Sequence, residues 1–94
     1  RGCIVDGPFG LDNAISQEAA RCKGIHSPVA GKPDILLMPD LCAGNIFTKS
    51  IHYFANIVSS GTLCGTTVPV VMTSRTDSPE DKYYSILTAI MQCM

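Results

Sequence analysis

A short run of apolar residues in the middle of the chain constrains the fold more than any other feature. Residues 35–38 read Ile-Leu-Leu-Met, and Pro39 follows them directly. Four consecutive apolar residues closed by a proline are typical of a β-strand that is covered on both faces, as strands of a parallel sheet are. Strands of a parallel sheet are joined by crossover connections, which are usually helices. The run therefore predicts an α/β fold with a parallel sheet.

Strand and helix patterns alternate along the rest of the chain. Besides residues 34–39, the sequence predicts strands at 3–6, 62–64 and 68–73. The spacing of apolar residues predicts helices at 12–23, 44–59 and 78–94. Asp12 is the expected N-cap of the first helix, and Ser78-Pro79 followed by two acids marks the start of the last. Alternation of this kind predicts right-handed parallel crossovers.

The composition indicates that the chain is part of something larger. It has 94 residues, of which 46% are hydrophobic and only 16% are charged, whereas a charged fraction of about 25% is usual. A chain of this length buries only roughly 60–65% of its unfolded surface, and the predicted helices can hardly cover both faces of a sheet. The chain also begins with Arg1 rather than methionine. We therefore expect a fragment that buries apolar surface against further polypeptide.

The charge and the cysteines argue against several classes of function. The net charge is −1 and the 7 Lys and Arg residues are spread along the chain, which argues against nucleic-acid binding. No run approaches the roughly 18 apolar residues of a membrane span, so no membrane association is expected. The 5 cysteines include no C-x-x-C pair, the spacing typical of zinc and redox sites. We expect free, buried thiols in a reducing cytoplasm, with no metal and no cofactor.

The turn after the predicted strand at 68–73 combines residues that suit an anion. Ser74 and Arg75 lie between an apolar strand and a helix N-terminus, where free backbone N–H groups, the positive helix end and a guanidinium favour a ligand such as phosphate. The Ser74 hydroxyl can donate to a carbonyl oxygen or an oxyanion. Asp77 and Asp81 can accept a proton. The alternative is structural, with Asp81 in the helix cap, Asp77 in the turn and Arg75 on the surface.

A second turn, after the predicted strand at 34–39, offers another cationic group. Asn45 and Lys49 are four residues apart, so both point to one face of the predicted helix and together suit an anionic substrate. The carboxyl ends of parallel strands are also where ligands bind in such sheets. The alternative is that Asp40 or Asn45 caps the helix and that Lys49 is solvated. For His52, beside aromatic residues in this helix, we expect a structural or solvent-exposed role.

In these segments the sequence resembles the C-terminal part of the phosphate acetyl/butyryl transferase family. The resembling segments follow the family's order and cover nearly the whole chain, at residues 5–8, 11–14, 30–37, 39–49 and 73–78. The most specific are Pro-Asp-Leu-x-Ala-Gly-Asn-x-x-x-Lys at 39–49 and the Thr-Ser-Arg turn at 73–75. The Asp-Gly-Pro segment and the Thr-Ser-Arg-Thr-Asp-Ser segment are closer to the phosphate butyryltransferase branch than to the acetyl branch.

The resemblance implies a reversible transfer of an acyl group between CoA and inorganic phosphate, with CoA as a substrate and no cofactor. A carboxylate takes the proton of the CoA thiol, and the thiolate attacks the acyl phosphate without a covalent enzyme intermediate. By position, Ser74 would stabilise the carbonyl oxygen and Arg75 would bind phosphate. Asp81 matches the base of the acetyl branch. The butyryl branch often lacks an acid there, which leaves Asp77 or Glu80 for that role.

The resemblance also implies that Asn45 and Lys49 contact phosphate or CoA. The family fold is a three-layer sandwich with a parallel sheet, like that of isocitrate and isopropylmalate dehydrogenases, with two α/β domains around a cleft, and its members are usually homo-oligomers. Residues 1–65 would end the second domain, and residues 66–94 would be a C-terminal strand and helix that return to the first. The chain alone is then expected to be inactive, because the arginines of the family's N-terminal part are missing.

Two alternatives remain beside this hypothesis. One is a metal-dependent dehydrogenase of the same fold, although the spaced aspartates at 6, 12, 34 and 40 do not form a clear metal-binding cluster. The other is a non-catalytic piece of an α/β enzyme that binds a partner chain through its apolar surface.

Overall fold

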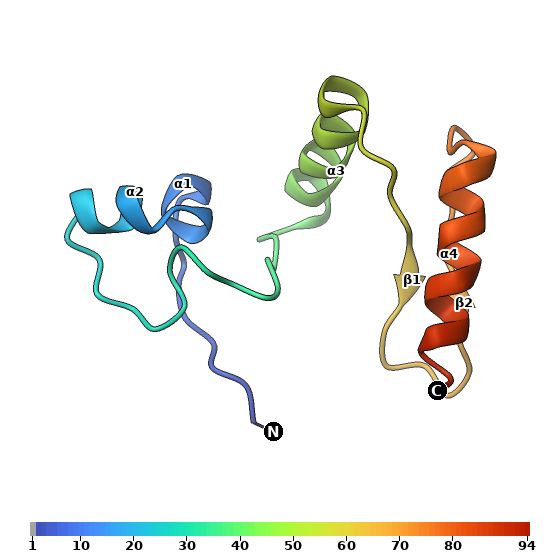
Figure 1. The fold of residues 1–94 in the computed structure, drawn as a ribbon, viewed down its shortest axis with the longest axis horizontal. Coiled ribbons are helices and arrows are strands. Elements are labelled where there is room, and N and C mark those ends of the chain that lie inside the picture. The colour runs from blue at the N-terminus through green and yellow to red at the C-terminus, as the bar shows by residue number, and fades with distance from the viewer. Residues whose placement is uncertain (1) are drawn as a thin grey trace. The chain divides into compact units, whose positions relative to one another are not determined.

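The computed structural model describes residues 2–94, which form two compact units that divide between Pro39 and Asp40 (Figure 1). The first unit contains α1 (Leu11–Ile15) and α2 (Gln17–Cys22). The second contains α3 (Leu41–Ala55), β1 (Thr62–Leu63), β2 (Val70–Val71) and α4 (Pro79–Met91). All of the predicted site residues lie after Pro39, so the second unit carries the candidate site.

The helix predicted at 12–23 is two short helices that meet at Ser16. The Ser16 backbone is extended (φ −124°, ψ 117°), and its hydroxyl accepts a hydrogen bond of 3.2 Å from the N–H of Ala19. A serine side chain that caps in this way competes with continuous helical bonding of the backbone. The predicted N-cap is also wrong, because Gly10 takes that position. Asp12 lies in the first turn of α1 and pairs with Lys23 at 2.7 Å.

Gly31 allows the loop after α2 to approach the junction between α1 and α2. Its φ is +82°, and its N–H donates a hydrogen bond of 2.9 Å to the carbonyl oxygen of Ala14. A Cβ at this position would collide with the backbone of Gln17. Because Ala20 and Ala30 are also buried in this unit, small residues let its backbone segments pack closely.

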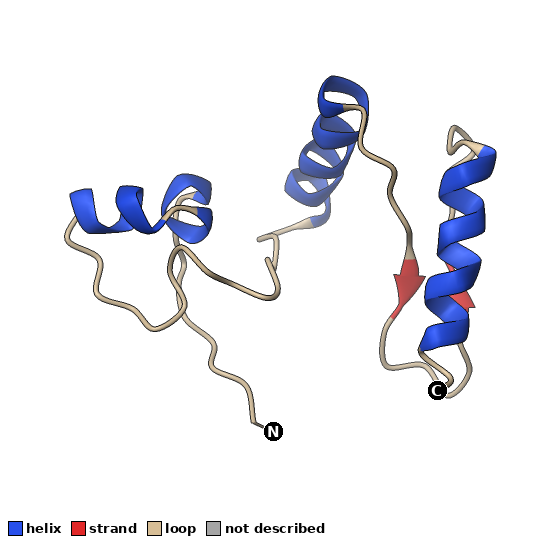
Figure 2. Ribbon diagram, viewed as in Figure 1, coloured by secondary structure: helices blue, strands red, loops and turns tan. Residues whose placement is uncertain are grey.

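Two of the predicted strands do not form within residues 2–94. The runs at 3–6 and 35–38 have no strand structure (Figure 2), and Ile35 and Leu37 are 83% and 91% exposed. A strand persists only where a neighbouring segment satisfies its backbone N–H and C=O groups. No segment of the described chain pairs with these two runs. The prediction of these strands is therefore wrong for the residues described.

The sheet that does form is small and antiparallel. β1 pairs with β2, with Thr62 opposite Val71 and Leu63 opposite Val70. The predicted strands at 62–64 and 68–73 are confirmed in position but are shorter than expected. The sheet expected from the sequence is parallel, whereas this pair is antiparallel, because the short loop between the two strands can join only antiparallel neighbours. Within residues 2–94 the architecture is thus a small α/β arrangement with a two-stranded sheet.

The helix α3 begins three residues before the predicted position. The Asp40 side chain accepts a hydrogen bond of 2.8 Å from the N–H of Ala43 and is the N-cap. At the other end, Asn56 adopts a left-handed conformation (φ 53°) and stops the helix at Ala55 rather than at Ser59. The capping role that the sequence left open for Asp40 is therefore confirmed.

The helix α4 begins as the sequence predicts. Ser78 is its N-cap, Pro79 is its first residue, and the Ser78 and Asp81 side chains each accept a hydrogen bond from the other's backbone N–H. This reciprocal arrangement is a capping box. The helix ends at Met91, three residues before the predicted end at Met94.

Polar side chains along one face of α4 bind the segment that leads into β1. The bonds run from the N–H of Ser59 to Asp81 Oδ1 (2.8 Å), from the N–H of Gly61 to Ser85 Oγ (3.0 Å), from Thr88 Oγ1 to Ser60 Oγ (3.1 Å), and from Gln92 Nε2 to Thr62 Oγ1 (2.8 Å). We call these four contacts the polar ladder. They recur at helical spacing, so a single face of α4 holds residues 59–62.

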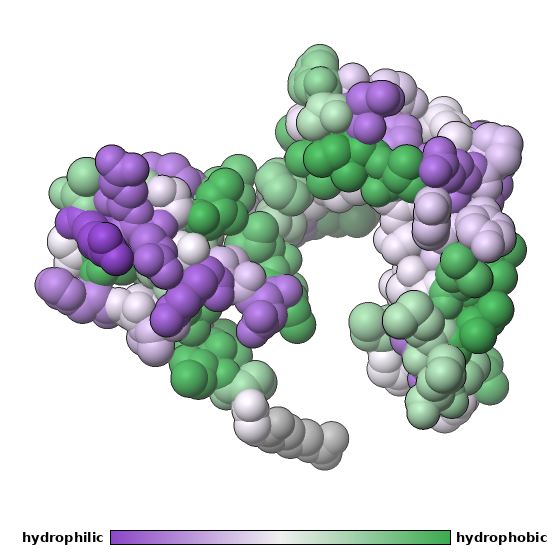
Figure 3. All heavy atoms as spheres, in the orientation of Figure 1, coloured by the Kyte–Doolittle hydropathy of each residue, from purple (hydrophilic) through white to green (hydrophobic). Residues whose placement is uncertain are grey.

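Few apolar side chains are buried in the described residues. The buried apolar residues are Ala20, Ala30 and Ala89. Large side chains such as Leu41 and Phe54 are exposed, and Figure 3 shows hydrophobic surface on both units. The apolar excess seen in the composition therefore lies on the surface of the structure.

The cysteines share this exposure. All 5 are free, as the sequence predicts, but all are exposed rather than buried. The expectation of burial is wrong for the described residues, in which the buried apolar side chains are alanines and the large apolar side chains are exposed as well. Among residues 2–94, no helix has both the length and the apolar character needed to span a membrane.

Ser85→Ala tests whether the polar ladder holds α4 to the segment before β1. The change removes the hydroxyl of Ser85, which is 1% exposed and accepts the part-buried N–H of Gly61, and a donor left without an acceptor costs up to about 1–3 kcal/mol. We expect the free energy of unfolding to fall by about that amount in a denaturant titration followed by circular dichroism. Ser60→Ala is the matched control at an exposed contact, with an expected change below about 0.5 kcal/mol. Equal losses in the two variants would contradict the ladder.

Candidate functional site

The two turns that the sequence singled out meet at one ion pair. Lys49 lies in the middle of α3, and Asp77 lies in the turn between β2 and α4. The Lys49 Nζ is 3.8 Å from Asp77 Oδ1, and the side chains are 37% and 15% exposed. Lys49 is thus half-buried against the turn rather than fully solvated. The fold brings together two predicted site residues that are 28 positions apart in the sequence.

The turn itself is organised by Asp77. Its Oδ2 accepts a hydrogen bond of 2.6 Å from the N–H of Ser74, and its own N–H donates one of 3.2 Å to the Ser74 carbonyl. The Ser74 hydroxyl lies 3.1 Å from the hydroxyl of Thr76 and is exposed. The turn therefore holds Ser74 next to the Asp77 carboxylate. Lys49 lies beside the same carboxylate.

Two of the backbone N–H groups at the start of α4 have side-chain partners within the chain. The Ser78 N–H donates to Asp81 Oδ2 at 2.9 Å, and the Asp81 N–H donates to Ser78 Oγ at 3.1 Å. Pro79 has no N–H, and the Ser74 N–H is taken by Asp77. Side chains of the same segment therefore already accept the N–H groups of Ser74, Ser78 and Asp81, and the anion site expected from free N–H groups here stays a prediction.

Asp81 is the most completely bonded side chain of the region. It is 1% exposed, and besides the Ser78 N–H it accepts the Ser78 hydroxyl at 2.6 Å and the Ser59 N–H at 2.8 Å. These donors, the Ser78 hydroxyl first and then the Ser59 and Ser78 N–H groups, lower the pKa of Asp81 to about 2. The carboxylate is therefore ionised and accepts three hydrogen bonds within the chain. The structural alternative for Asp81, a place in the helix cap, is confirmed.

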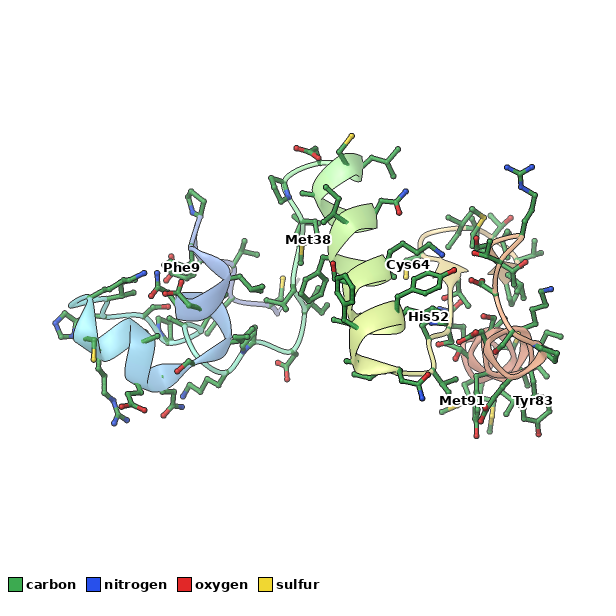
Figure 4. All side chains as sticks on the ribbon, turned by 90° about the horizontal axis from the view of Figure 1, so that it is seen from above. Phe9, Met38, His52, Cys64, Tyr83 and Met91 are labelled. Atoms are coloured by element: carbon green, nitrogen blue, oxygen red, sulfur yellow. The ribbon has the colours of Figure 1, made fainter. Side chains whose placement is uncertain are left out.

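His52 belongs to this region, which the sequence did not predict. Its Nδ1 is buried, lies 3.9 Å from Asp81 Oδ1 and has no hydrogen-bond partner within the described residues. Figure 4 shows His52 on the side of α3 that faces α4, whereas Tyr83 and Met91 point outward from α4. The available signal was spacing, because His52 follows Lys49 by three residues and so shares its face of the helix.

The other predicted site residues lie at the surface. Arg75 is exposed at the tip of the turn, next to Ser74. Asn45 is one helical turn before Lys49 and is exposed; within residues 2–94, no hydrogen bond or ion pair joins it to the turn. Glu80 is exposed in the first turn of α4. The structure therefore brings Ser74, Asp77 and Lys49 together and leaves Asn45 apart.

The arrangement combines a hydroxyl donor, two cationic side chains and a carboxylate. Arg75 and Lys49 can attract an anion, the Ser74 hydroxyl can donate to an oxygen that gains charge, and Asp77 can accept a proton. In the part of the chain that the structure describes, no three His, Cys, Asp or Glu side chains gather as a metal site would require. A surface hollow along residues 63–69, Gln92 and Cys93 lies at the opposite end of α4. The side chains that could take part in a reaction therefore lie at and beside the turn between β2 and α4.

Comparison with known proteins gives a consistent result. Residues 1–90 match the family model described as "Phosphate acetyl/butaryl transferase". The chain is 59% identical over 86 residues to the phosphate acetyltransferase of Thermotoga maritima, and 52% identical over 91 residues to the phosphate butyryltransferase of Clostridium beijerinckii. These alignments cover 92% and 97% of this chain.

A solved structure supports the same relationship. The crystal structure of a branched-chain phosphotransacylase from Enterococcus faecalis V583 superimposes with a TM-score of 0.82 at 43% sequence identity and covers 94% of this chain. The chain spans about a third of that structure (33%) and 29–30% of the two relatives named above. Acetyl and butyryl enzymes both match, so the similarity does not single out the butyryl branch. The match over residues 1–90 and these identities show that the chain belongs to the phosphate acetyl/butyryl transferase family.

Proposed function

We propose that this chain is the C-terminal portion of an acyltransferase that moves an acyl group reversibly between CoA and inorganic phosphate. The observation that carries the proposal is the Ser74–Asp77 turn, which presents a hydroxyl and a guanidinium at its tip and receives Lys49 from α3. Membership of a family whose relatives are named phosphate acetyltransferase and phosphate butyryltransferase supports it. The comparisons give no support to the alternative of a metal-dependent dehydrogenase.

Each group of the turn has a role in this reaction. The Ser74 hydroxyl donates a hydrogen bond to the carbonyl oxygen of the acyl phosphate as that oxygen gains negative charge. Arg75 binds the phosphate group through its planar fork of N–H donors. A carboxylate, Asp77 or Asp81, takes the proton of the CoA thiol. The thiolate sulfur then bonds to the carbonyl carbon, the bond from that carbon to the phosphate oxygen breaks, and inorganic phosphate leaves.

The remaining substrate contacts come from α3 and from beyond this chain. Lys49 and Asn45 contact phosphate or CoA, Lys49 from a position next to the turn and Asn45 one helical turn away. CoA is a substrate, and the reaction uses no resident cofactor. Both acetyl and butyryl relatives match this region, at 59% and 52% identity, so the match does not identify the acyl chain.

The proposal also includes the domain organisation of the longer protein. Residues 1–65 end the second α/β domain of a longer protein, and residues 66–94 return to its first domain. The runs at 3–6 and 35–38 become strands of a parallel three-layer sandwich, like that of isocitrate and isopropylmalate dehydrogenases, once neighbouring strands pair with them. Their exposed apolar side chains support this step. The longer protein is a cytoplasmic homo-oligomer, for which the free thiols are suited.

Ser74→Ala in the full-length protein tests the role of the hydroxyl. Loss of one donor to a developing oxyanion lowers kcat by about 10²–10³-fold, and we expect that loss in an assay of acyl phosphate formation from acyl-CoA and phosphate. Arg75→Ala should instead raise the KM for phosphate, with Arg75→Lys recovering only part of the loss. Lys82→Ala, an exposed cation on α4, is the control and should leave both constants unchanged. Wild-type turnover in the Ser74 and Arg75 variants would remove this turn from the mechanism.

The 94-residue chain on its own is expected to form no acyl phosphate. It spans only about 30% of the length of its relatives, so most of the substrate-binding surface lies outside it. The measurement is the same assay with the purified chain, beside the full-length protein at equal molar concentration. Formation of acyl phosphate by the short chain at the full-length rate would contradict the division of the site between this segment and the rest.

A further inference from the structure

His52 of α3 carries a polar atom that is buried without a partner. Its Nδ1 makes no hydrogen bond within residues 2–94, although it lies 3.9 Å from Asp81 Oδ1. Most buried polar atoms in proteins are hydrogen-bonded, so an exception needs an explanation. Resting on the proposed acyl transfer, we propose that His52 is a positioning residue. Its Nδ1–H closes onto Asp81 Oδ1 and thereby holds Lys49 at the Ser74–Asp77 turn, where an anionic substrate binds.

Asp81 has capacity for the hydrogen bond that His52 lacks. Its Oδ2 accepts the N–H and the hydroxyl of Ser78, whereas its Oδ1 accepts only the N–H of Ser59 within the described residues. A carboxylate oxygen has lone pairs for two donors. The 3.9 Å between His52 Nδ1 and Asp81 Oδ1 exceeds a hydrogen bond by about 1 Å. A small approach of the two side chains would therefore satisfy both atoms.

The charge of Asp81 determines which form of the imidazole suits this contact. Hydrogen-bond donors, the Ser78 hydroxyl first, lower the pKa of Asp81 to about 2, so the carboxylate is ionised at neutral pH. An unprotonated Nδ1 would direct a lone pair at this negative charge, whereas a protonated Nδ1 donates to it. Both the neutral ring with its proton on Nδ1 and the charged ring meet this condition. The charged ring gives the stronger hydrogen bond.

The contact of His52 lies beside the contact of Lys49. The two residues are three positions apart on one face of α3, and their partners Asp77 and Asp81 are four positions apart, in the turn and at the start of α4. Figure 4 shows His52 on the side of α3 that faces α4. The Lys49 side chain is 37% exposed, and an ion pair with so exposed a partner contributes little alone. The more buried His52–Asp81 contact therefore positions α3, and Lys49 with it.

Protonation of His52 gives the contact a dependence on pH. The titratable groups near its ring are Asp81 from α4 and, from its own helix, Lys49 and Tyr53, whose ring lies edge-on at 5.1 Å. An imidazole ordinarily changes its charge between about pH 5 and pH 8. The charged ring pairs more strongly with the carboxylate, so the contact is strongest at the acidic end of this range and weakens as the pH rises. The hold of Lys49 on its substrate weakens with it.

The position of the imidazole proton tests the contact without an activity assay. In the full-length protein with ¹⁵N-labelled histidine, the NMR signals of His52 are identified by their loss in His52→Gln. We expect the neutral ring to carry its proton on Nδ1, because the carboxylate selects that form, and we expect Asp81→Asn to remove the preference. A neutral wild-type ring with its proton on Nε2 would overturn the proposal, whether or not Asp81→Asn folds.

Substrate affinity at two pH values tests the positioning role. Lys49→Ala first identifies the substrate, phosphate or acyl-CoA, whose KM depends on this lysine. For that substrate we expect His52→Gln to raise KM by about 3–10-fold at pH 6, where a charged hydrogen bond is lost, and to change it little at pH 8. The effect on kcat should be smaller than the effect on KM. Each comparison with the wild type is made at one pH, so titration of the substrate cancels. His26→Gln, an exposed histidine of the first unit, is the matched control and should leave both constants unchanged.

A double variant shows whether His52 acts through Lys49. If it does, Lys49→Ala with His52→Gln has the KM of Lys49→Ala alone, since coupled residues are not additive. Additive effects, or the same KM ratio at pH 6 and pH 8, would overturn the positioning role. A Lys49→Ala variant with both KM values of the wild type would refute the substrate role of Lys49 and the proposal with it. A wild-type protein without acyl transfer would refute the proposed function, while the proton on His52 Nδ1 would still report the contact with Asp81.

Discussion

The buried carboxylate of Asp81 is the constraint on which the second unit depends. Ala89 is the buried apolar residue of this unit, so apolar packing alone gives little to fix α4 against the strands. The carboxylate joins the cap of α4 to the N–H of Ser59, and the rest of the polar ladder continues this attachment along the helix. A charged group without donors would be costly to bury. Here the N–H and hydroxyl donors stabilise the buried carboxylate, and the carboxylate is the acceptor that these donors need. The position of the Ser74–Asp77 turn follows from this contact.

The parts of the fold that could be predicted depend on residues close together in the sequence. Ser78-Pro79 with Asp81 predicts the start of α4 correctly, because cap and partner lie within one helical turn. Strands at 3–6 and 35–38 could not be settled in this way, since a strand needs a partner that the local sequence does not specify. The break between α1 and α2 is harder to predict than the start of α4. Its local signal is the single residue Ser16, which ends one helix and caps the next.

The same distinction between contacts of nearby residues and contacts of distant residues applies to the candidate site. The Ser74–Asp81 turn and the side of α3 with Lys49 could each be recognised from local patterns. Their meeting at 3.8 Å could not, because it depends on where the tertiary structure places α3 relative to the turn before α4. His52 was missed for a related reason: a histidine beside aromatic residues suggests no chemistry until Asp81 is placed opposite it. The sequence also suggested free N–H groups at the helix start, whereas the side chains of Ser78 and Asp81 accept two of them.

The occupied helix N-terminus changes how an anion can be held here. A phosphate at an open helix start is bound by N–H groups and by the helix dipole, and in this chain Asp81 already takes that place. In the proposed function, side chains meet the phosphate, and Arg75 and Lys49 are the cations beside the turn. Lys49 faces Asp77, so its charge is shared between that carboxylate and an incoming anion.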